Sequence, residues 1–194
     1  MQAIVGLGNP GGEYAGMRHN VGWMVVERLA ERHGTRIDRT RRRGLRAAAR
    51  YGQFEHQGRV VRVIEPWLLM NRSGEALRAF GDELGAEDVL LVCDDVNLPL
   101  GRLRIRAEGG AGGHHGLASC LEALGTEQVA RLRIGVGGGA PGADLVRVVL
   151  AKFRPDEQPQ VAEMLERAAA ACETWIEHGI EAAMNRHNAA TETA

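Results

Sequence analysis

The sequence predicts a single α/β domain with helices on both faces of a central sheet. Short apolar runs alternate with segments of helical periodicity, and turn residues separate them. Neither a linker nor an internal repeat divides the 194 residues, a length that fits one globular domain. With 44% hydrophobic and 25% charged residues, the composition is typical of folded proteins. We place the domain at residues 1–188 and a short polar tail at residues 189–194.

The first elements are a strand and a helix joined by a glycine-rich loop. Residues 3–6 form an apolar run that ends in Gly-Leu-Gly-Asn-Pro-Gly-Gly, which predicts a buried strand followed by an irregular loop. Apolar residues at helical spacing between Asn20 and Gly34 predict a helix, with Asn20 as its N-cap. The arginine-rich segment 39–50 fits either a loop or a partly exposed strand.

Strands and helices alternate along the rest of the chain. We expect strands at residues 58–64, 89–93, 103–107 and 132–136. We expect helices at residues 73–80 and 116–124, and a long amphipathic helix around residues 161–176. The strand at residues 89–93 is fully apolar and delivers Asp94 and Asp95 at its carboxyl end.

The composition also excludes several classes of protein. No window approaches ~18 consecutive apolar residues, which argues against a membrane-spanning helix. The amino terminus enters an apolar run without a basic region or cleavage site, which argues against a secretory signal. Cys93, Cys120 and Cys172 are too widely spaced for a disulfide framework or a metal knuckle. We therefore expect a cytoplasmic protein without a metal or another cofactor.

Arginines supply nearly all of the positive charge, since Lys152 is the only lysine among 24 basic residues. Arg102, Arg104 and Arg106 alternate with apolar residues, so a strand would place them on one face about 6.6–6.8 Å apart. That spacing is close to the ~7 Å between phosphates of one nucleic-acid strand. Arg131 and Arg133 repeat the pattern. The arginines are either a solvated strand face or a surface that binds the phosphates of a folded RNA.

Polar side chains cluster at the ends of the predicted elements. They are Asn9, His19, Asn71, Asp94 and the pair His114-His115. Loops beyond the carboxyl ends of strands form the ligand sites of open α/β sheets. A histidine oriented by a carboxylate is an effective general base near neutral pH. Helix capping, turn formation and a flexible glycine loop are the alternative explanations for these residues.

The first glycine loop also matches the G-x-G-x-x-G pattern of dinucleotide-binding proteins. That fold requires a helix that starts inside the loop and a second strand that ends in an acidic residue. Pro10 and Gly12 keep this loop irregular, and the region around Glu27 has helical periodicity. The sequence therefore disfavours dinucleotide binding.

Five blocks of residues carry a more specific signal. They are Gly6-Leu7-Gly8-Asn9-Pro10-Gly11 with Tyr14, Arg18-His19-Asn20 and Gly22; Met70-Asn71-Arg72-Ser73-Gly74; Asp94-Asp95 with Leu98-Pro99 and Gly101; Gly112-Gly113-His114 with Gly116-Leu117; and residues 131–137. In this order, from about residue 2 to residue 188, the chain resembles bacterial peptidyl-tRNA hydrolases. That family has a single α/β domain with a mixed central sheet.

The resemblance implies hydrolysis of the ester between a peptide and the 3′-terminal ribose of tRNA. It implies that His19 is the general base, that Asp94 stabilises it, and that Asn9 helps to select peptidyl-tRNA over free aminoacyl-tRNA. The positions that would contact the tRNA are Tyr14, Leu69, Asn71 and His115 at its end, and Arg106 and Arg133 at a phosphate. We add Asn71 as a candidate donor to the developing oxyanion. We expect a monomer that needs no metal, no obligate protein partner and no membrane.

Four positions depart from the usual family pattern. His115 stands where asparagine is usual, Leu69 where phenylalanine is common, Met17 replaces a threonine and Asn97 an aspartate. The imidazole of His115 lacks the paired donor and acceptor of an amide, which changes its contact with water or the tRNA end. The rival hypothesis is therefore a non-catalytic RNA-binding protein that retains the fold.

Overall fold

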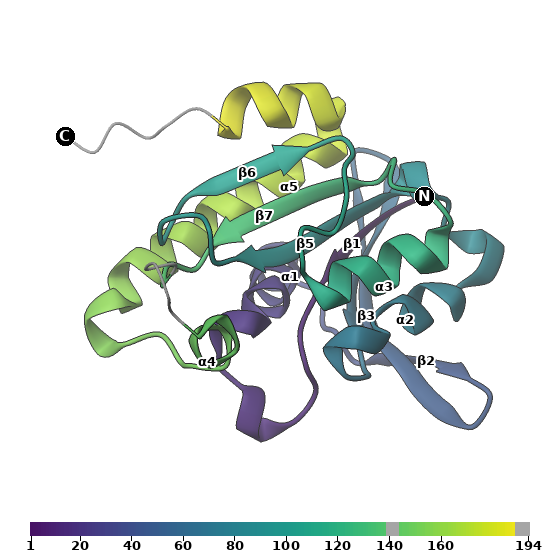
Figure 1. Ribbon diagram of the computed structural model, residues 1–194. Helices are drawn as coiled ribbons and strands as arrows, with labels where there is room; N and C mark the ends of the chain where they lie inside the picture. The colour runs from purple at the N-terminus through teal and green to yellow at the C-terminus, as the bar shows by residue number, and fades with distance from the viewer. Residues whose placement is uncertain (139–143, 189–194) are drawn as a thin grey trace.

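The computed structural model describes residues 1–138 and 144–188, which form one seven-stranded mixed sheet (Figure 1). The strand order is β2-β3-β4-β1-β5-β7-β6. The strands are β1 (Gln2–Gly6), β2 (Arg39–Arg43), β3 (Arg46–His56), β4 (Arg59–Pro66), β5 (Val89–Asp95), β6 (Leu103–Arg106) and β7 (Ala130–Gly135). This confirms the predicted α/β class with a mixed sheet.

The four central strands, β4, β1, β5 and β7, are parallel to one another. Both edges are antiparallel, with the hairpin β2–β3 beside β4 at one edge and β6 beside β7 at the other. Because the central strands are parallel, their carboxyl ends meet at one edge of the sheet. The segments after β1 and β4 carry Asn9, His19 and Asn71, and Asp94 lies near the end of β5.

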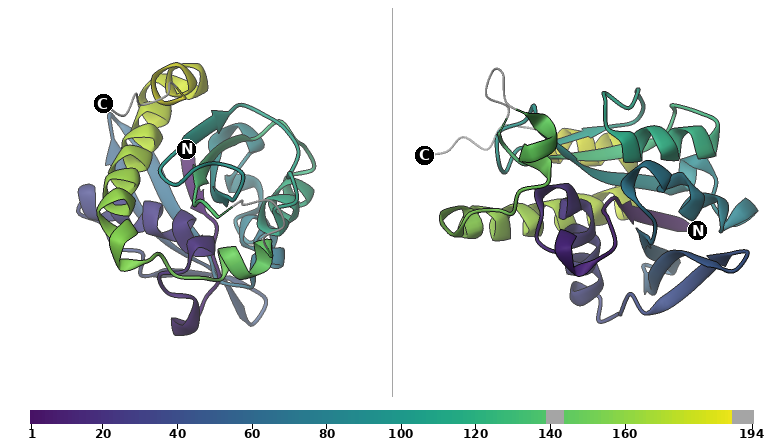
Figure 2. Two further views of the ribbon diagram at one scale, coloured as in Figure 1. Left: turned by 60° about the vertical axis from the view of Figure 1, so that its left-hand side comes forward. Right: turned by 60° about the horizontal axis from the view of Figure 1, so that its bottom comes forward.

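Helices cover both faces of the sheet, as Figure 2 shows. On one face α1 (Val21–Arg32) and α5 (Gln158–His187) pack on an apolar core that includes Val25, Leu90 and Ile134. On the other face α2 (Gly74–Arg78) and α3 (His115–Leu124) pack on a second core, around Val5 and Leu91. Neighbouring residues of β1 and β5 therefore point into opposite cores, which fixes the register of the sheet.

Short helical turns connect these elements. The 3₁₀ turns are η1 (Gly12–Tyr14), η2 (Arg18–Asn20), η3 (Met70–Arg72), η4 (Gly81–Glu83), η5 (Ala86–Asp88) and η6 (Pro155–Glu157). No helix starts inside the first glycine loop, since the chain passes through η1 and η2 before α1. The structure therefore agrees with the argument against a dinucleotide fold.

Glycines let the first loop lie directly against α1. A Cβ on Gly22 would lie 2.4 Å from the Val92 carbonyl oxygen and 2.5 Å from the Leu7 nitrogen. A Cβ on Gly6 would lie 2.2 Å from the Gly22 carbonyl oxygen. Helix α1 therefore begins in backbone contact with β1 and β5, and this contact brings η2 to the end of β5.

The arginine-rich segment is the first half of an antiparallel hairpin, so the strand alternative was correct. The helix α4 (Leu145–Val149) was not predicted. Helix α5 is longer than expected, and Gly179 interrupts it with φ 80° and ψ −178°. The predicted tail at residues 189–194 lies outside the described residues. Among the described helices, none combines the length and apolarity that crossing a membrane requires.

Candidate active site

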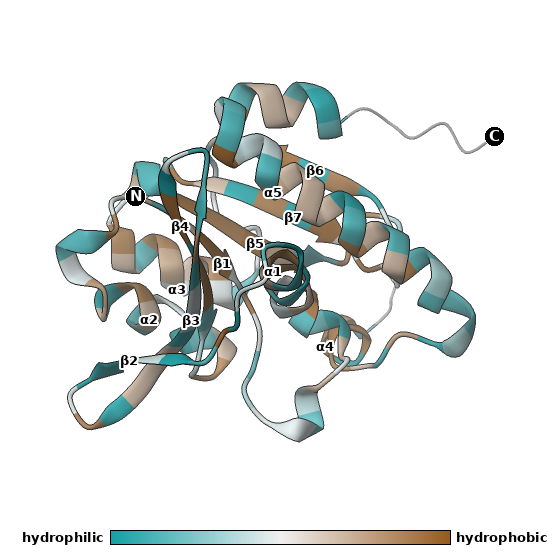
Figure 3. Ribbon diagram, turned by 180° about the vertical axis from the view of Figure 1, so that it is seen from behind, coloured by the Kyte–Doolittle hydropathy of each residue, from teal (hydrophilic) through white to brown (hydrophobic). Residues whose placement is uncertain are grey.

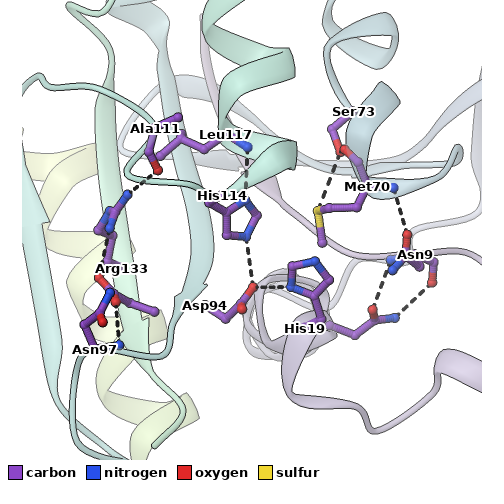
Figure 4. A network of polar contacts seen from close by, with 12 residues as sticks. Asn9, His19, Met70, Ser73, Asp94, Asn97, Ala111, His114, Leu117 and Arg133 are labelled. Carbon is purple, nitrogen blue, oxygen red and sulfur yellow. Dashed lines mark hydrogen bonds and ion pairs between the residues drawn. The ribbon is translucent and has the colours of Figure 1, made fainter. Parts of the chain in front are cut away.

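His19 and Asp94 meet at the carboxyl edge of the sheet. His19 lies on η2, Asp94 lies near the end of β5, and the His19 Nδ1 is 2.8 Å from the Asp94 Oδ1 (Figure 4). The Asp94 side chain is 3% exposed and that of His19 is 15% exposed. The two residues are 75 positions apart in the chain, and the packing of α1 against β5 brings them together.

His114 is a second partner of the same carboxylate oxygen. Its Nε2 lies 2.9 Å from the Asp94 Oδ1, and its Nδ1 accepts a hydrogen bond of 3.1 Å from the Leu117 backbone N–H. His114 is thus the N-cap of α3. Because Nδ1 is an acceptor here, the proton sits on Nε2 and is donated to Asp94. The cap fixes the tautomer of His114.

The same logic fixes the state of His19. The Asp94 carboxylate accepts a hydrogen bond from the Nδ1–H of His19, so the Nε2 of a neutral ring keeps its lone pair. Burial alone would raise the pKa of Asp94, but the hydrogen bonds from His114 and His19 hold that pKa well below its usual range. Asp94 therefore stays ionised, and it holds the His19 ring in an orientation that leaves Nε2 available.

Asn9 is held rigidly beside His19. Its backbone N–H donates to the Asn20 Oδ1 at 3.0 Å, and its carbonyl oxygen accepts from the Asn20 Nδ2 at 2.9 Å. Its side-chain Oδ1 accepts from the Met70 backbone N–H at 2.7 Å. Within residues 1–138 and 144–188, the Asn9 Nδ2 has no hydrogen-bond partner, so this amide N–H₂ is free to donate.

The prediction that Asn20 caps α1 was wrong. Asn20 occupies the N-cap position, but its side chain makes no capping hydrogen bond. Its amide instead pairs with the Asn9 backbone as a neighbouring strand would. The side chain therefore ties the first glycine loop to η2, which is the turn that carries His19.

Two cavities meet at His19. The larger, about 410 Å³, extends from His19 to α4 and is walled by Leu145, Val146 and Leu150. The smaller, about 270 Å³, extends toward η3 and is lined by Leu69, Met70 and Asn71. Three residues line both cavities: Asn9, His19 and His115. His19 therefore lies where one ligand can be bound with one part in each cavity.

Most of the predicted tRNA-end contacts lie around these cavities. Tyr14 lines the larger cavity, and Leu69 and Asn71 line the smaller one. Leu69 is 54% exposed. His115 is the first residue of α3 and borders both cavities, whereas the neighbouring His114 is turned inward to Asp94.

The predicted arginine surface is only partly exposed. Arg104 and Arg106 are exposed on β6, the edge strand. Arg131 is 2% exposed, and its guanidinium donates to the carbonyl oxygens of Val129, Glu127, Gly109 and Gly110. Including Arg131 in a basic surface was therefore wrong, because it holds the glycine loop in place.

Arg133 lines the larger cavity but already has protein partners. Its Nη1 lies 2.9 Å from the Asp95 Oδ2, and its Nη2 donates to the Ala111 carbonyl oxygen at 2.7 Å. Arg133 thus connects β5 to the loop that carries His114. Arg106 is not among the residues that line either cavity.

The ligand atoms of His19, Asp94 and His114 lie within 4.8 Å of one another. A cation there would require the Nε2 lone pair of His114, but that nitrogen carries the proton donated to Asp94. Hydrogen bonds therefore account for all three side chains without a metal ion.

The sequence did not single out His114 or identify the role of Asn20. Both histidines of the pair follow the same glycines, so spacing alone cannot say which one turns inward. The predicted helix start at residue 116 would have made His115 the candidate N-cap, whereas α3 begins at His115 and is capped by His114.

Comparison with known proteins identifies the family. The family model described as peptidyl-tRNA hydrolase matches residues 3–194. A peptidyl-tRNA hydrolase of Synechococcus sp. (strain JA-3-3Ab) is 47% identical over 97% of this chain and 83% of its own length. One from Bacillus subtilis (strain 168) is 38% identical over 97% and 99%.

The three-dimensional comparison agrees. A crystal structure of peptidyl-tRNA hydrolase from Acinetobacter baumannii has a TM-score of 0.84 and 32% sequence identity, over 97% of this chain and 95% of that one. The match spans the whole sheet and the helices on both of its faces. By sequence and by fold, the chain belongs to the peptidyl-tRNA hydrolase family.

Proposed function

We propose that the chain hydrolyses the ester between the peptide and the 3′-terminal ribose of peptidyl-tRNA, with His19 as the general base. The observation that carries this proposal is the His19–Asp94 pair at the junction of two cavities. Hydrolysis of an ester needs a base that removes a proton from water during attack, and such a base typically contributes ~10²–10⁴-fold.

The reaction uses one proton transfer in each direction. A water molecule gives a proton to the His19 Nε2 while its oxygen attacks the ester carbonyl carbon. The bond from that carbon to the ribose oxygen then breaks, and His19 returns the proton to this oxygen. The ionised Asp94 stabilises the transient imidazolium through the Nδ1–H.

Two amides are suited to the oxyanion that forms between these steps. The Asn9 Nδ2 is held by the hydrogen bond of its Oδ1 to Met70, so its orientation is set before the substrate arrives. Asn71 lines the smaller cavity together with Asn9. One donor of this kind is worth roughly 10²–10³-fold in kcat.

The two cavities suit the two arms of the substrate. The apolar wall of α4 is suited to peptide side chains, and the smaller cavity with Asn71 is suited to the terminal ribose. Tyr14, Leu69 and His115 would then contact the tRNA end. Arg106 and Arg133 would hold a tRNA phosphate, Arg133 through the guanidinium N–H groups that its protein partners leave free. We propose that the enzyme acts in the cytoplasm as a monomer.

Hydrolysis of N-acetyl-aminoacyl-tRNA and of unblocked aminoacyl-tRNA tests this proposal. We expect turnover of the blocked substrate only, and a loss of about 10²–10⁴-fold in kcat for His19→Ala with the fold retained. His178→Ala, which removes an exposed histidine of α5, is the control. Equal rates on both substrates would refute the proposal. Binding without cleavage would favour the non-catalytic RNA-binding protein.

A further inference from the structure

The hairpin β2–β3 carries a concentration of positive charge far from β6. Residues 36–46 contain six arginines and a single acidic residue, Asp38. Figure 3 shows β2 as a hydrophilic strand that extends beyond α2, with the turn of the hairpin at its tip. Four arginines of the two strands are exposed: Arg39, Arg42, Arg43 and Arg46. We call these four residues the hairpin arginines.

The fold does not neutralise this charge. Arg41 pairs with Glu83 and packs over the Phe80 ring, so it belongs to the packing against α2. Within the described part of the chain, none of the hairpin arginines forms an ion pair. Arg43 and Arg46 are directly opposite each other in the hairpin register. Like charges in opposite positions destabilise a strand pair, so this arrangement lowers the stability of the hairpin.

The hairpin tip lies near the beginning of α2. The pKa of Glu75 is lowered by the hydrogen bond from Arg72 and, more weakly, by the charges of Arg43 and Arg46. Arg72 follows Asn71, which lines the smaller cavity next to His19. Arg72 itself pairs with Glu75, so the unpaired positive charge beside the beginning of α2 comes from the hairpin arginines.

We propose that the hairpin arginines bind the phosphodiester backbone of RNA outside the active site. Guanidinium groups bind phosphate through parallel N–H donors, and exposed side chains follow a flexible backbone without reading its sequence. The apolar tip residue, Leu45, is 95% exposed, and no aromatic side chain accompanies it on the turn. The contact is therefore electrostatic and independent of base sequence. This inference rests on the proposed function only for the identity of the RNA.

Two RNAs have this chemistry: the body of the tRNA substrate and an unrelated RNA. A second explanation is structural, because β2 is an edge strand and arginines on an edge prevent pairing with another chain. These explanations predict different effects of neutralising the charges.

The test variant carries glutamine at the four hairpin positions (R39Q/R42Q/R43Q/R46Q). A matched control removes four exposed arginines elsewhere (R59Q/R78Q/R154Q/R186Q). A third variant has lysine at the hairpin positions and keeps the charge. Affinity for a 20-base-pair duplex RNA is measured by fluorescence anisotropy between 50 and 200 mM salt, and oligomeric state by light scattering.

We expect the glutamine variant to bind the duplex roughly tenfold more weakly, or worse, at 50 mM salt. The slope of log Kd plotted against log salt concentration should fall by about 3 in this variant, since each lost phosphate contact lowers the slope by ~0.7–0.9. The lysine and control variants should resemble the natural chain. Unchanged affinity and slope in the glutamine variant would overturn the proposal, and a new dimer with unchanged affinity would assign the charges to edge protection.

Steady-state kinetics then identify the RNA. Full-length N-acetyl-aminoacyl-tRNA is compared with the same ester on a 3′-terminal trinucleotide. A tenfold rise in KM for the full-length substrate alone, with kcat unchanged, assigns the contact to the tRNA body. Weaker duplex binding with both KM values unchanged assigns it to another RNA. The duplex measurement needs no turnover, so it remains informative if the natural chain hydrolyses neither substrate.

Discussion

The proton positions at Asp94 follow from a single helix cap. The Leu117 N–H donates to His114, which in turn donates to Asp94, and the Asp94 carboxylate accepts from His19. Each donor in this chain has one acceptor, so the arrangement admits only one tautomer for each neutral ring. The basicity of His19 Nε2 thus depends on a carboxylate that cannot itself donate.

Replacing that carboxylate by an amide tests this logic. Asp94→Asn keeps an oxygen that can accept from both imidazoles, because both bond the same Oδ1, but it removes the charge that stabilises the imidazolium. We expect kcat to fall by roughly 10²–10⁴-fold with a much smaller change in KM. Steady-state hydrolysis of N-acetyl-aminoacyl-tRNA provides the measurement.

The neighbouring carboxylate supplies the control for this substitution. Asp95 binds Arg133 and the Asn97 N–H but neither imidazole. Asp95→Asn should therefore change kcat by less than tenfold. Equal losses for the two substitutions would contradict the assignment of Asp94.

Asn20 should act through Asn9 rather than through helix α1. Asn20→Ala removes both hydrogen bonds to the Asn9 backbone, and we expect a loss of about 1–3 kcal/mol in the free energy of unfolding. We also expect kcat to fall, because the Asn9 amide loses its fixed position. Urea unfolding and steady-state kinetics measure the two effects.

Asn20→Ser separates the two explanations for this residue. Serine is a good N-cap but is too short to bridge the Asn9 backbone with both a donor and an acceptor. The serine variant should therefore resemble the alanine variant. If the serine variant were as stable as the natural chain, the result would instead favour a capping role for Asn20.

The sequence could identify which residue types form the site but not which neighbour occupies it. His19 and Asp94 each end a recognisable element, so their loops were expected at one sheet edge. His114 and His115 differ only by one helical position, which turns one side chain toward Asp94 and the other toward the cavities. A choice of this kind depends on the angle at which α3 approaches the sheet, and no local pattern encodes that angle.

At the scale of elements, α5 ends by protecting the exposed edge of β6. The Ile105 N–H donates to the Asn188 Oδ1 at 2.6 Å, and the Asn188 Nδ2 donates to the Ile105 carbonyl oxygen at 3.0 Å. The break at Gly179 redirects the last turns of α5, and they end at this edge. One amide side chain thus takes the place of a neighbouring strand.

Asn188→Ala should release this edge. We expect a loss of about 1–2 kcal/mol in the free energy of unfolding, because the Ile105 N–H and carbonyl lose their partner. Hydrogen exchange at the Ile105 amide should accelerate by tenfold or more. Asn185→Ala, an exposed position of α5 with no such contact, is the control. Unchanged exchange at Ile105 would contradict this role of Asn188.

Elements with one dominant local signal were predicted well. Strand β5 begins with five consecutive apolar residues, and α1 and α5 have clear helical periodicity. The hairpin β2–β3 was ambiguous, because arginine favours neither a strand nor a loop and the exposed strand β2 has no alternation of apolar and polar residues. Helix α4 has five residues with Arg147 between pairs of apolar side chains, too short for a period to be recognised.

At the scale of the whole molecule, the parallel centre of the sheet gathers the site from loops far apart in the chain. The segments after β1 and β4 supply Asn9 and Asn71, and the carboxyl end of β5 supplies Asp94. The edge strands β2 and β6 carry exposed arginines, and the loop after β6 adds His114 to the cluster. The proposed catalytic residues and the arginines proposed to attract RNA therefore lie on different parts of one sheet.

A buried carboxyl group on β4 makes the stability of the whole fold depend on pH. Glu65 is 2% exposed, and burial raises its pKa to about 8, with the charge of Glu27 adding to the rise and that of Arg50 opposing it. In the unfolded chain the same group has a pKa of 4.5. Between these values the folded state binds the extra proton, so its stability falls as pH rises.

Glu65→Gln should remove this dependence. The variant keeps a neutral side chain at every pH. As pH rises from 4.5 to 8.5, the free energy of unfolding of the variant should therefore increase relative to that of the natural chain. The difference between the two free energies of unfolding should grow by roughly 3–5 kcal/mol over this range, because each pH unit between the two pKa values contributes about 1.36 kcal/mol. Asp94 does not obscure the effect, because its lowered pKa matters only in more acidic solution. Urea unfolding across this range measures the difference, with the exposed Glu55→Gln as control. Parallel curves for the natural chain and Glu65→Gln would show that Glu65 is already ionised in the folded protein.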